Sequence, residues 1–194
     1  MSASSAASSS VREAFAAVPR TAFLPEAQRQ FAAQDQPLDI GGGQTSSQPS
    51  TVFNMLELLD VRPGMRVLDV GAGSGWTTAL LAHLTGPDGR VVGVEIDPRL
   101  AAWGGRNVAA LVEGARARVE TAQPGVLGWP AEAPYDRILV SAMARKLPEE
   151  LVDQLAPLGV MVAPVKGRML RVVKDSGGAT HVSEHGLYRF VPLR

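Results

Sequence analysis

Residues 67–76 read Val67-Leu68-Asp69-Val70-Gly71-Ala72-Gly73-Ser74-Gly75-Trp76, and this stretch decides the fold. An apolar run from Met65 to Val70 predicts a buried strand, and the residues from Gly75 to Leu84 predict a helix. The glycines between them allow a sharp turn and a close approach of the backbone to a ligand. The start of the helix adds free N–H donors at the same place. Strand, glycine loop and helix in this order predict a nucleotide-type binding site.

The spacing of the glycines indicates which class of ligand the loop binds. Dinucleotide-binding loops carry G-x-G-x-x-G, whereas this loop carries G-x-G-x-G behind the acidic Asp69. That pattern is typical of methyltransferases that bind S-adenosylmethionine, which has no phosphate. A second carboxylate, Glu95, ends the next predicted strand and can accept hydrogen bonds from both ribose hydroxyls. The alternative is a plain tight turn with Glu95 as a strand cap, and the agreement of all these features disfavours it.

The rest of the chain alternates strands with helices. Helices are expected at 98–111 and from Pro148, and strands are expected at 90–95, 117–121, 135–141, 160–165, 169–174 and about 181–191. This alternation predicts an α/β fold, a doubly wound, Rossmann-like sheet that is mostly parallel and covered on both faces. The last two strands, joined across Gly177-Gly178, should form an antiparallel pair.

The N-terminal third precedes this core. We expect a disordered tail over residues 1–10, a helix from about Ser10 to Pro19, and a second short helix from Pro25 to about Ala33. Residues 35–50 predict an irregular loop, after which Pro49 opens another helix. Residues 11–194 should thus form a single domain, with the N-terminal helices and the loop in 11–61 and the Rossmann-like core in 62–194.

Composition excludes several classes of protein. Of 194 residues, 45% are apolar and 20% charged, as in ordinary globular domains. The 19 Lys and Arg balance the 19 Asp and Glu, so no overall attraction to nucleic acid or to a membrane is expected. The absence of cysteine excludes disulfides, thiolate nucleophiles and Cys-ligated metals. No apolar run is long enough to span a bilayer, and Met1–Ser10 lacks the features of a secretion signal. We expect a cytoplasmic monomer.

From Val11 to Leu193 the sequence resembles the protein-L-isoaspartate O-methyltransferase family. The segments that carry this resemblance are Val18-Pro19-Arg20, Phe23-Leu24-Pro25-Glu26, Pro37-Leu38, Gly43-Gln44-Thr45-x-Ser47-Gln48-Pro49, Gly71-x-Gly73-Ser74-Gly75, Ala133-Pro134-Tyr135-Asp136 and Phe190-Val191-Pro192-Leu193. Families that share only the methyltransferase fold lack the Gly-Gln-Thr-x-Ser loop upstream of the glycine loop.

The resemblance implies transfer of a methyl group from S-adenosylmethionine to the α-carboxylate of an L-isoaspartyl residue in a damaged protein or peptide. The ester then cyclises to a succinimide, whose hydrolysis regenerates some normal aspartate. By resemblance, Ser47 is the active-site hydroxyl and Thr45 lies beside it. An alternative role for these hydroxyls is to cap the helix that opens at Pro49. The expected cofactor-binding residues are Asp69, Gly71, Gly73, Ser74, Gly75, Glu95 and Gln123.

The chemistry fits such a site, because a carboxylate with an ordinary pKa of about 3.9 is ionised at neutral pH and needs no general base. The protein has only to align the reacting atoms, exclude water and hold the carboxylate. No metal is expected. His181 and His185 are four residues apart, but they fall in a predicted strand or turn rather than on one face of a helix.

Two positions depart from the family pattern. Pro124 stands where the family carries an aspartate that faces the adenine amino group, and a proline can neither accept that bond nor donate its own N–H. Gln123 can substitute as an acceptor. Met143-Ala144-Arg145 replaces small residues, which we expect to reshape the substrate mouth. Two alternatives therefore remain: a dedicated peptide-aspartate methyltransferase, and a non-catalytic relative with weakened cofactor binding.

Overall fold

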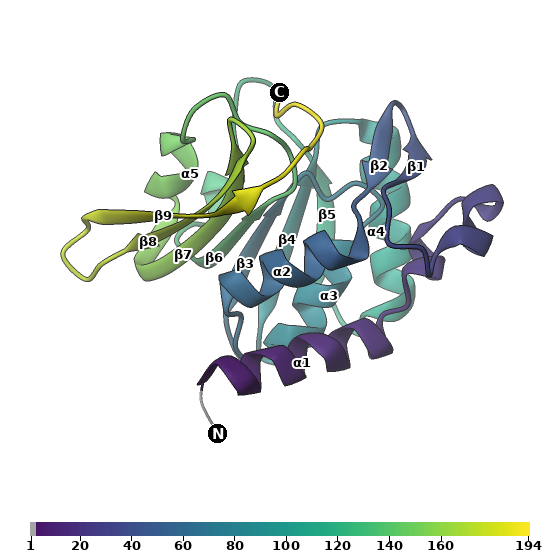
Figure 1. The fold of residues 1–194 in the computed structure, drawn as a ribbon, viewed down its shortest axis with the longest axis horizontal. Coiled ribbons are helices and arrows are strands. Elements are labelled where there is room, and N and C mark those ends of the chain that lie inside the picture. Colours follow the sequence, from purple (N-terminus) through teal and green to yellow (C-terminus); the bar gives the residue numbers. More distant parts are fainter. Residues whose placement is uncertain (1–2) are drawn as a thin grey trace.

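The computed structural model describes residues 3–194 and centres on a seven-stranded sheet (Figure 1). Its strand order is β5-β4-β3-β6-β7-β8-β9. The strands are β3 (Arg66–Val70), β4 (Arg90–Glu95), β5 (Ala117–Thr121), β6 (Tyr135–Val140), β7 (Leu155–Val165), β8 (Arg168–Lys174) and β9 (Thr180–Leu187). The helices are α1 (Ala3–Ala17), α2 (Pro49–Leu59), α3 (Trp76–Thr85), α4 (Pro98–Leu111) and α5 (Glu149–Asp153), with 3₁₀ turns at Arg20–Phe23, Glu26–Phe31 and Pro130–Glu132.

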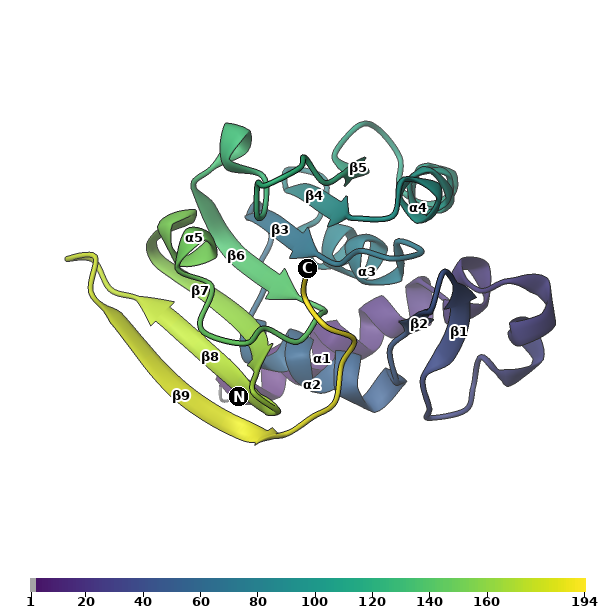
Figure 2. The same ribbon diagram turned by 90° about the horizontal axis from the view of Figure 1, so that it is seen from above.

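The expected Rossmann-like sheet is confirmed. Strands β3 to β7 pair in parallel, β8 is antiparallel to β7, and β9 is antiparallel to β8. The order reverses at β3, which has β4 on one side and β6 on the other. Doubly wound sheets bind ligands beyond the carboxyl ends of their strands at such a reversal. The glycine loop leaves β3 at that point, between the neighbouring strands β4 and β6 (Figure 2).

Alternation of side chains along each strand builds two cores. On β3, Val67 packs with α1, α2, α3 and α4 on one face of the sheet. Leu68 and Val70 face the other side, where they share a cluster with Tyr135 and Leu151. Helices dominate the first face, whereas the second is covered by the short α5 and the segment between β5 and β6.

The first helix begins earlier than predicted. The sequence predicts a helix from about Ser10 after a disordered tail, but α1 begins at Ala3. Alanine has the highest intrinsic helix propensity, and the hydroxyl of Ser9 donates to Glu13 one turn later at 3.1 Å. Residues 3–10 are therefore helical, and Met1 and Ser2 lie outside the described residues.

The region predicted as an irregular loop contains a small hairpin. Strands β1 (Leu38–Gly41) and β2 (Gln44–Ser46) pair antiparallel. Gly42 and Gly43 between them have φ of 63° and 72°, the left-handed conformation that a tight hairpin turn requires. Such short strands give too little alternation to detect, although Leu38 and Ile40 are buried and Asp39 between them is exposed.

A buried carboxylate anchors the start of α3 behind the glycine loop. Asp69 is 0% exposed, and its Oδ2 accepts hydrogen bonds of 2.7 Å from both Thr77 and Thr78. Its Oδ1 has no partner among the described residues. Burial away from water raises the pKa of Asp69 to about 6, although the two hydroxyls oppose the shift.

Ionisation of Asp69 should oppose folding, because its pKa is about 6 in the folded protein and about 3.9 in the unfolded chain. The folded state thus binds more protons in this window, so the free energy of unfolding falls as pH rises from about 4 to about 6. The total fall should be about 2–3 kcal/mol. In Asp69→Asn the side chain cannot ionise, so this variant should not show the fall in the free energy of unfolding. Urea unfolding of both proteins between pH 4 and 7 measures the difference, and a constant gap would contradict this assignment.

Candidate active site

Three adjoining cavities lie at the carboxyl ends of the strands. The outer cavity, of about 560 Å³, is bounded by the start of α2 and by the C-terminal segment, residues 188–194. The inner cavity, of about 80 Å³, lies over the glycine loop. The side cavity, of about 840 Å³, shares Ile96, Ala122 and Leu127 with the inner one. Thr45 and Ser141 line both the outer and the inner cavity and therefore mark their junction.

The glycine loop forms the floor of the inner cavity through Gly71 and Gly73. A Cβ on Gly73, whose φ is +53°, would lie 3.1 Å from Cδ1 of Ile40, so a side chain would crowd the space that a ligand needs. Gly75 lies behind the loop instead, where a Cβ would come within 2.8 Å of the carbonyl oxygen of Gly104 on α4. Ser74 is buried, and it lines a small recess of about 30 Å³ that Ser47 also lines.

Glu95 presents a rigid carboxylate to the inner cavity. It is 5% exposed, and the backbone N–H groups of Asp97 and Gly73 donate to its Oε1 at 3.0 Å and its Oε2 at 2.9 Å. Each oxygen can accept a further hydrogen bond, so a pair of hydroxyls from a ribose suits this carboxylate. Asp69, by contrast, does not line the cavity, since it lies behind the loop and anchors α3.

The side cavity can hold the base of a nucleoside. Gln123 and Pro124 line it, and so does Ile96, which is 52% exposed although it is large and apolar. Ile96 is not among the residues predicted from the sequence, although its place directly after the strand-terminal Glu95 is a signal that could have revealed it. Among the residues that line this cavity, the only carboxylate side chain belongs to Glu150.

Met143-Ala144-Arg145 lies beside the side cavity. Ala144 and Arg145 line the side cavity and do not line the outer one. Met143 holds the C-terminal segment, because its N–H donates to Val191 at 2.7 Å and its carbonyl oxygen accepts from Leu193 at 2.9 Å.

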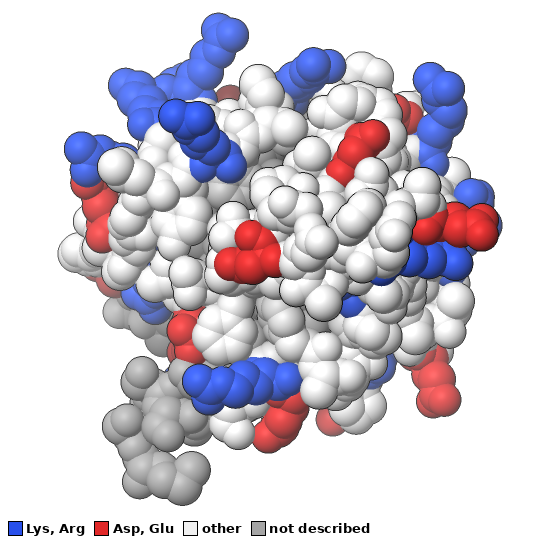
Figure 3. All heavy atoms as spheres, turned by 45° about the vertical axis from the view of Figure 1, so that its right-hand side comes forward, with Lys and Arg blue, Asp and Glu red and all other residues white. Residues whose placement is uncertain are grey.

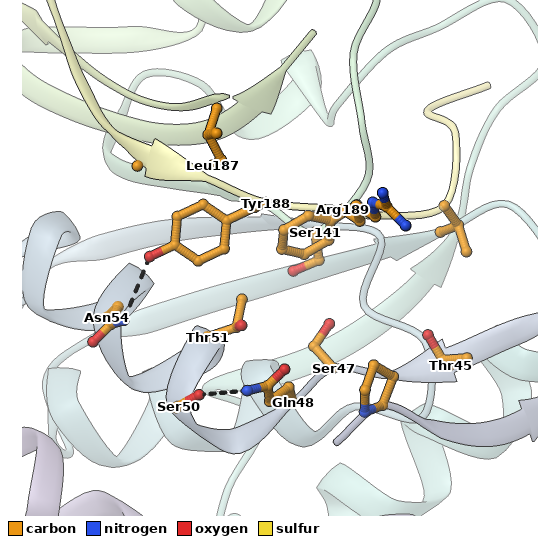
Figure 4. A pocket seen from close by; sticks show the side chains of 14 residues that line it. Thr45, Ser47, Gln48, Ser50, Thr51, Asn54, Ser141, Leu187, Tyr188 and Arg189 are labelled. Carbon is orange, nitrogen blue, oxygen red and sulfur yellow. Dashed lines mark hydrogen bonds between the residues drawn. The ribbon is translucent and has the colours of Figure 1, made fainter. Parts of the chain in front are cut away.

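Three hydroxyls surround the junction of the cavities (Figure 4). Thr45 and Ser47 come from the end of the hairpin, and Ser141 follows β6. The first two are predicted from the sequence. Ser141 is not, because its hydroxyl reaches the site only through the position of β6 beside β3.

Another group caps α2, so Ser47 is not needed for that role. The N-cap residue is Gln48, which makes no side-chain capping bond. Instead Asp35 accepts hydrogen bonds from the N–H of Ser50 at 2.8 Å and from the amide of Gln48 at 2.9 Å. These bonds, led by that from Ser50, lower the pKa of Asp35 below its usual value. This arrangement leaves the hydroxyl of Ser47 available to the site.

Arg20 fixes the backbone that carries these hydroxyls. Its side chain is buried and donates to the hydroxyl of Ser46 at 3.1 Å and to the carbonyl oxygens of Ser46 and Ser47 at 2.9 Å each. Further bonds reach the carbonyl oxygens of residues 32, 34 and 36. The guanidinium also lies over the ring of Trp76, the first residue of α3, at 5.4 Å. Burial lowers the pKa of Arg20 to about 10, so it remains charged at neutral pH.

His181 and His185 lie on β9 and line none of the three cavities. On β9, His181 lies 3.1 Å from a carboxylate oxygen of Asp175, and His185 lies 2.8 Å from the hydroxyl of Ser183. Within residues 3–194 no group of three or more His, Cys, Asp or Glu side chains is arranged to hold a metal ion. The same part of the chain contains no helix that is both long and apolar enough to cross a membrane.

Sheet, glycine loop and strand-terminal carboxylate together define the class of methyltransferases that use S-adenosylmethionine. Comparison with known proteins is more specific. Residues 2–194 match the model of the protein-L-isoaspartate(D-aspartate) O-methyltransferase family. A protein-L-isoaspartate O-methyltransferase from Methanopyrus kandleri is 47% identical over 96% of this chain and 84% of its own length. One from Aeropyrum pernix is 51% identical over 94% of this chain and 72% of its own length.

Solved structures agree with the sequences. A β-aspartate methyltransferase from Plasmodium falciparum, in complex with S-adenosyl-L-homocysteine, has a TM-score of 0.81 and 25% identity and covers 95% of this chain and 90% of its own. The chain therefore belongs to the protein-L-isoaspartate O-methyltransferase family, and it is an enzyme that depends on S-adenosylmethionine.

Replacement of Arg20 by lysine should lower kcat/KM by about 10- to 100-fold, because one ammonium cannot satisfy the carbonyl groups that the guanidinium fork binds. The free energy of unfolding should fall by about 1–3 kcal/mol. Affinity for S-adenosylhomocysteine should change little, since Arg20 lines none of the three cavities. Steady-state kinetics, urea unfolding and calorimetry on one preparation check the three effects. Unaltered kinetics in a destabilised variant would leave Arg20 a structural role only.

Replacement of Pro124 by aspartate should strengthen binding of S-adenosylhomocysteine by about 0.5–1.5 kcal/mol, the value of one added hydrogen bond to the base. Pro124→Ala, which removes the ring and adds no acceptor, is the matched control. Calorimetry gives both affinities. If aspartate and alanine change the affinity equally, the missing acceptor is not what limits binding.

Proposed function

We propose that this protein methylates the free α-carboxylate of L-isoaspartyl residues in proteins and peptides, at the junction of the outer and inner cavities. The single observation that carries the proposal is the meeting of Thr45, Ser47 and Ser141 at that junction, beside the floor that Gly71 and Gly73 form. The names of its relatives support the same substrate class.

S-adenosylmethionine would be held by the backbone of Gly71 and Gly73, by Glu95 at its ribose and by the side cavity, including Gln123, at its base. When bound, it supplies a methyl group activated by the sulfonium charge, whose transfer to a carboxylate oxygen yields a methyl ester and a neutral thioether. Asp69 and Gly75 act from behind, where they fix the loop and the start of α3. Ser74 lines the recess that Ser47 also lines.

The acceptor carboxylate needs orientation rather than a base, because its ordinary pKa of about 3.9 leaves it ionised at neutral pH. Ser47 donates a hydrogen bond to one oxygen and leaves the other free to attack, with Thr45 and Ser141 beside it. Orientation of this kind lowers the barrier because the reacting atoms already lie along the line of displacement. The C-terminal segment closes the opposite side of the site, and its Val191 and Phe190 exclude water there.

A second candidate is a relative that binds the cofactor weakly and turns over slowly. Pro124 in the side cavity favours it, because no acceptor stands at that position. The intact set of Gly71, Gly73, Glu95 and Ser47 favours the enzyme instead.

We further propose that residues 11–194 act as one domain, and that the protein works in the cytoplasm as a monomer without nucleic acid partners. The zero net charge supports the last point. On the face shown in Figure 3, acidic and basic side chains are interspersed, although basic ones are more numerous along the upper edge.

Methyl transfer should be seen with an isoaspartyl peptide and be absent with its aspartyl twin. In that assay, Ser47→Ala should lower kcat by about 10- to 100-fold, because a hydrogen bond to a charged acceptor contributes about 1.5–3 kcal/mol. The affinity for S-adenosylhomocysteine should stay the same, because an orienting contact acts on the acceptor carboxylate alone.

Thermal melts of the same samples test the alternative role. If Ser47 capped α2, alanine would cost about 0.5–2 kcal/mol of stability and leave turnover intact. Because Thr45 can compensate in part, the double variant Thr45→Ala, Ser47→Ala completes the set. Full activity in that variant would refute a catalytic role for both hydroxyls.

A further inference from the structure

The outer cavity contains one charged side chain. Its fourteen lining residues supply hydroxyls, amides, glycine, proline, apolar and aromatic groups, and of these residues only Arg189 carries a formal charge. A second charge, that of Asp35, lies close to the wall behind Gln48, but its carboxylate is engaged by Gln48 and by the N–H of Ser50. An anion bound in the outer cavity would therefore find one cation, Arg189, on one wall.

The backbone around Arg189 is fixed, whereas its guanidinium is free of ion pairs. The N–H of Tyr188 donates to Gly167 at 2.8 Å, and Val191 accepts from Met143 at 2.7 Å. Among residues 3–194, no carboxylate lies within 4.0 Å of the Arg189 guanidinium. Figure 4 shows Tyr188, Ser141 and Arg189 along one wall of the cavity, with Thr45, Ser47, Gln48, Ser50 and Asn54 along the other.

The cation lies away from the junction where methyl transfer is proposed. Thr45 and Ser141 line both the outer and the inner cavity, but Arg189 lines only the outer one. This separation has a chemical reason, because a guanidinium placed on the accepting carboxylate would stabilise its negative charge and make it a poorer nucleophile. Hydroxyls hold the acceptor, and the cation is left to contact another part of the bound peptide.

We propose that Arg189 selects substrates with a second carboxylate, from an Asp or Glu side chain next to the isoaspartyl residue. This inference rests on the proposed function, since it assumes that the outer cavity receives the peptide. A guanidinium can bind such a carboxylate through two hydrogen bonds, whereas a neighbouring Lys on the peptide would be repelled.

The test uses isoaspartyl peptides that differ only in one flanking residue, Glu, Gln or Lys, placed before or after the isoaspartyl residue. On at least one side, wild-type kcat/KM should fall in the order Glu, Gln, Lys, with about three- to tenfold between Glu and Gln at low salt. The preference should weaken as salt rises, because screening reduces it. In Arg189→Gln the three peptides should become equal; Arg189→Lys should keep the order. Arg106→Gln removes an equal charge from the exposed side of α4 and should keep the order too.

Binding of the fluorescently labelled peptides, measured by anisotropy with saturating S-adenosylhomocysteine, gives the same comparison without turnover. The inference is overturned if the wild type shows no charge preference on either side, or if the preference persists in Arg189→Gln. It is also overturned if Arg189→Gln weakens all peptides equally, since the cation would then serve the accepting carboxylate. A wild type that binds peptides in the expected order but methylates none would refute the proposed function and not the role of Arg189.

Discussion

Backbone lies directly against backbone where the glycine loop meets α4, and the rest of the site depends on that contact. A Cβ on Gly104 would lie 2.7 Å from the carbonyl oxygen of Gly73, and one on Gly75 would lie 2.8 Å from that of Gly104. Any side chain at either position would push the helix off the loop. The loop would then lose its support, and with it the N–H of Gly73 that holds the carboxylate of Glu95. One steric constraint thus sets the floor of the cavity and the orientation of its acidic wall.

Arg20 extends this framework to the other half of the site. Arg20 lines none of the cavities described above, yet it binds the carbonyl oxygens of Ser46 and Ser47 and lies over Trp76 at the start of α3. Trp76 in turn donates from its indole nitrogen to the carbonyl oxygen of Val18 at 3.2 Å. The segment that carries the hydroxyls and the helix that carries the glycine loop are therefore held by the same N-terminal stretch. Two parts of the site that are distant in the sequence are thereby held in one framework.

The sequence predicts the core of this arrangement well because the core uses strong local signals. Strands β4 and β5 and helix α4 have the predicted bounds, and each is set by apolar runs, glycine or proline. The hairpin β1–β2 is missed because its strands are too short for a pattern, and the start of α1 is missed because Ser and Ala have no apolar period. Ser141 and Arg189 are missed for another reason. Their positions in the site depend on strand order and on the path of the C-terminal segment, which spacing along the chain does not reveal.

That C-terminal segment has a thermodynamic consequence. Val191 lines both the outer and the inner cavity, and Leu193 lines the inner and the side cavity. Two hydrogen bonds to Met143 hold this shared wall in place. A ligand in one cavity that orders or shifts the wall changes the free energy of binding in the next, and linkage requires the effect to be equal in both directions. A cofactor that orders this wall would therefore change the affinity for a peptide in the outer cavity, and the peptide would change the affinity for the cofactor by the same factor.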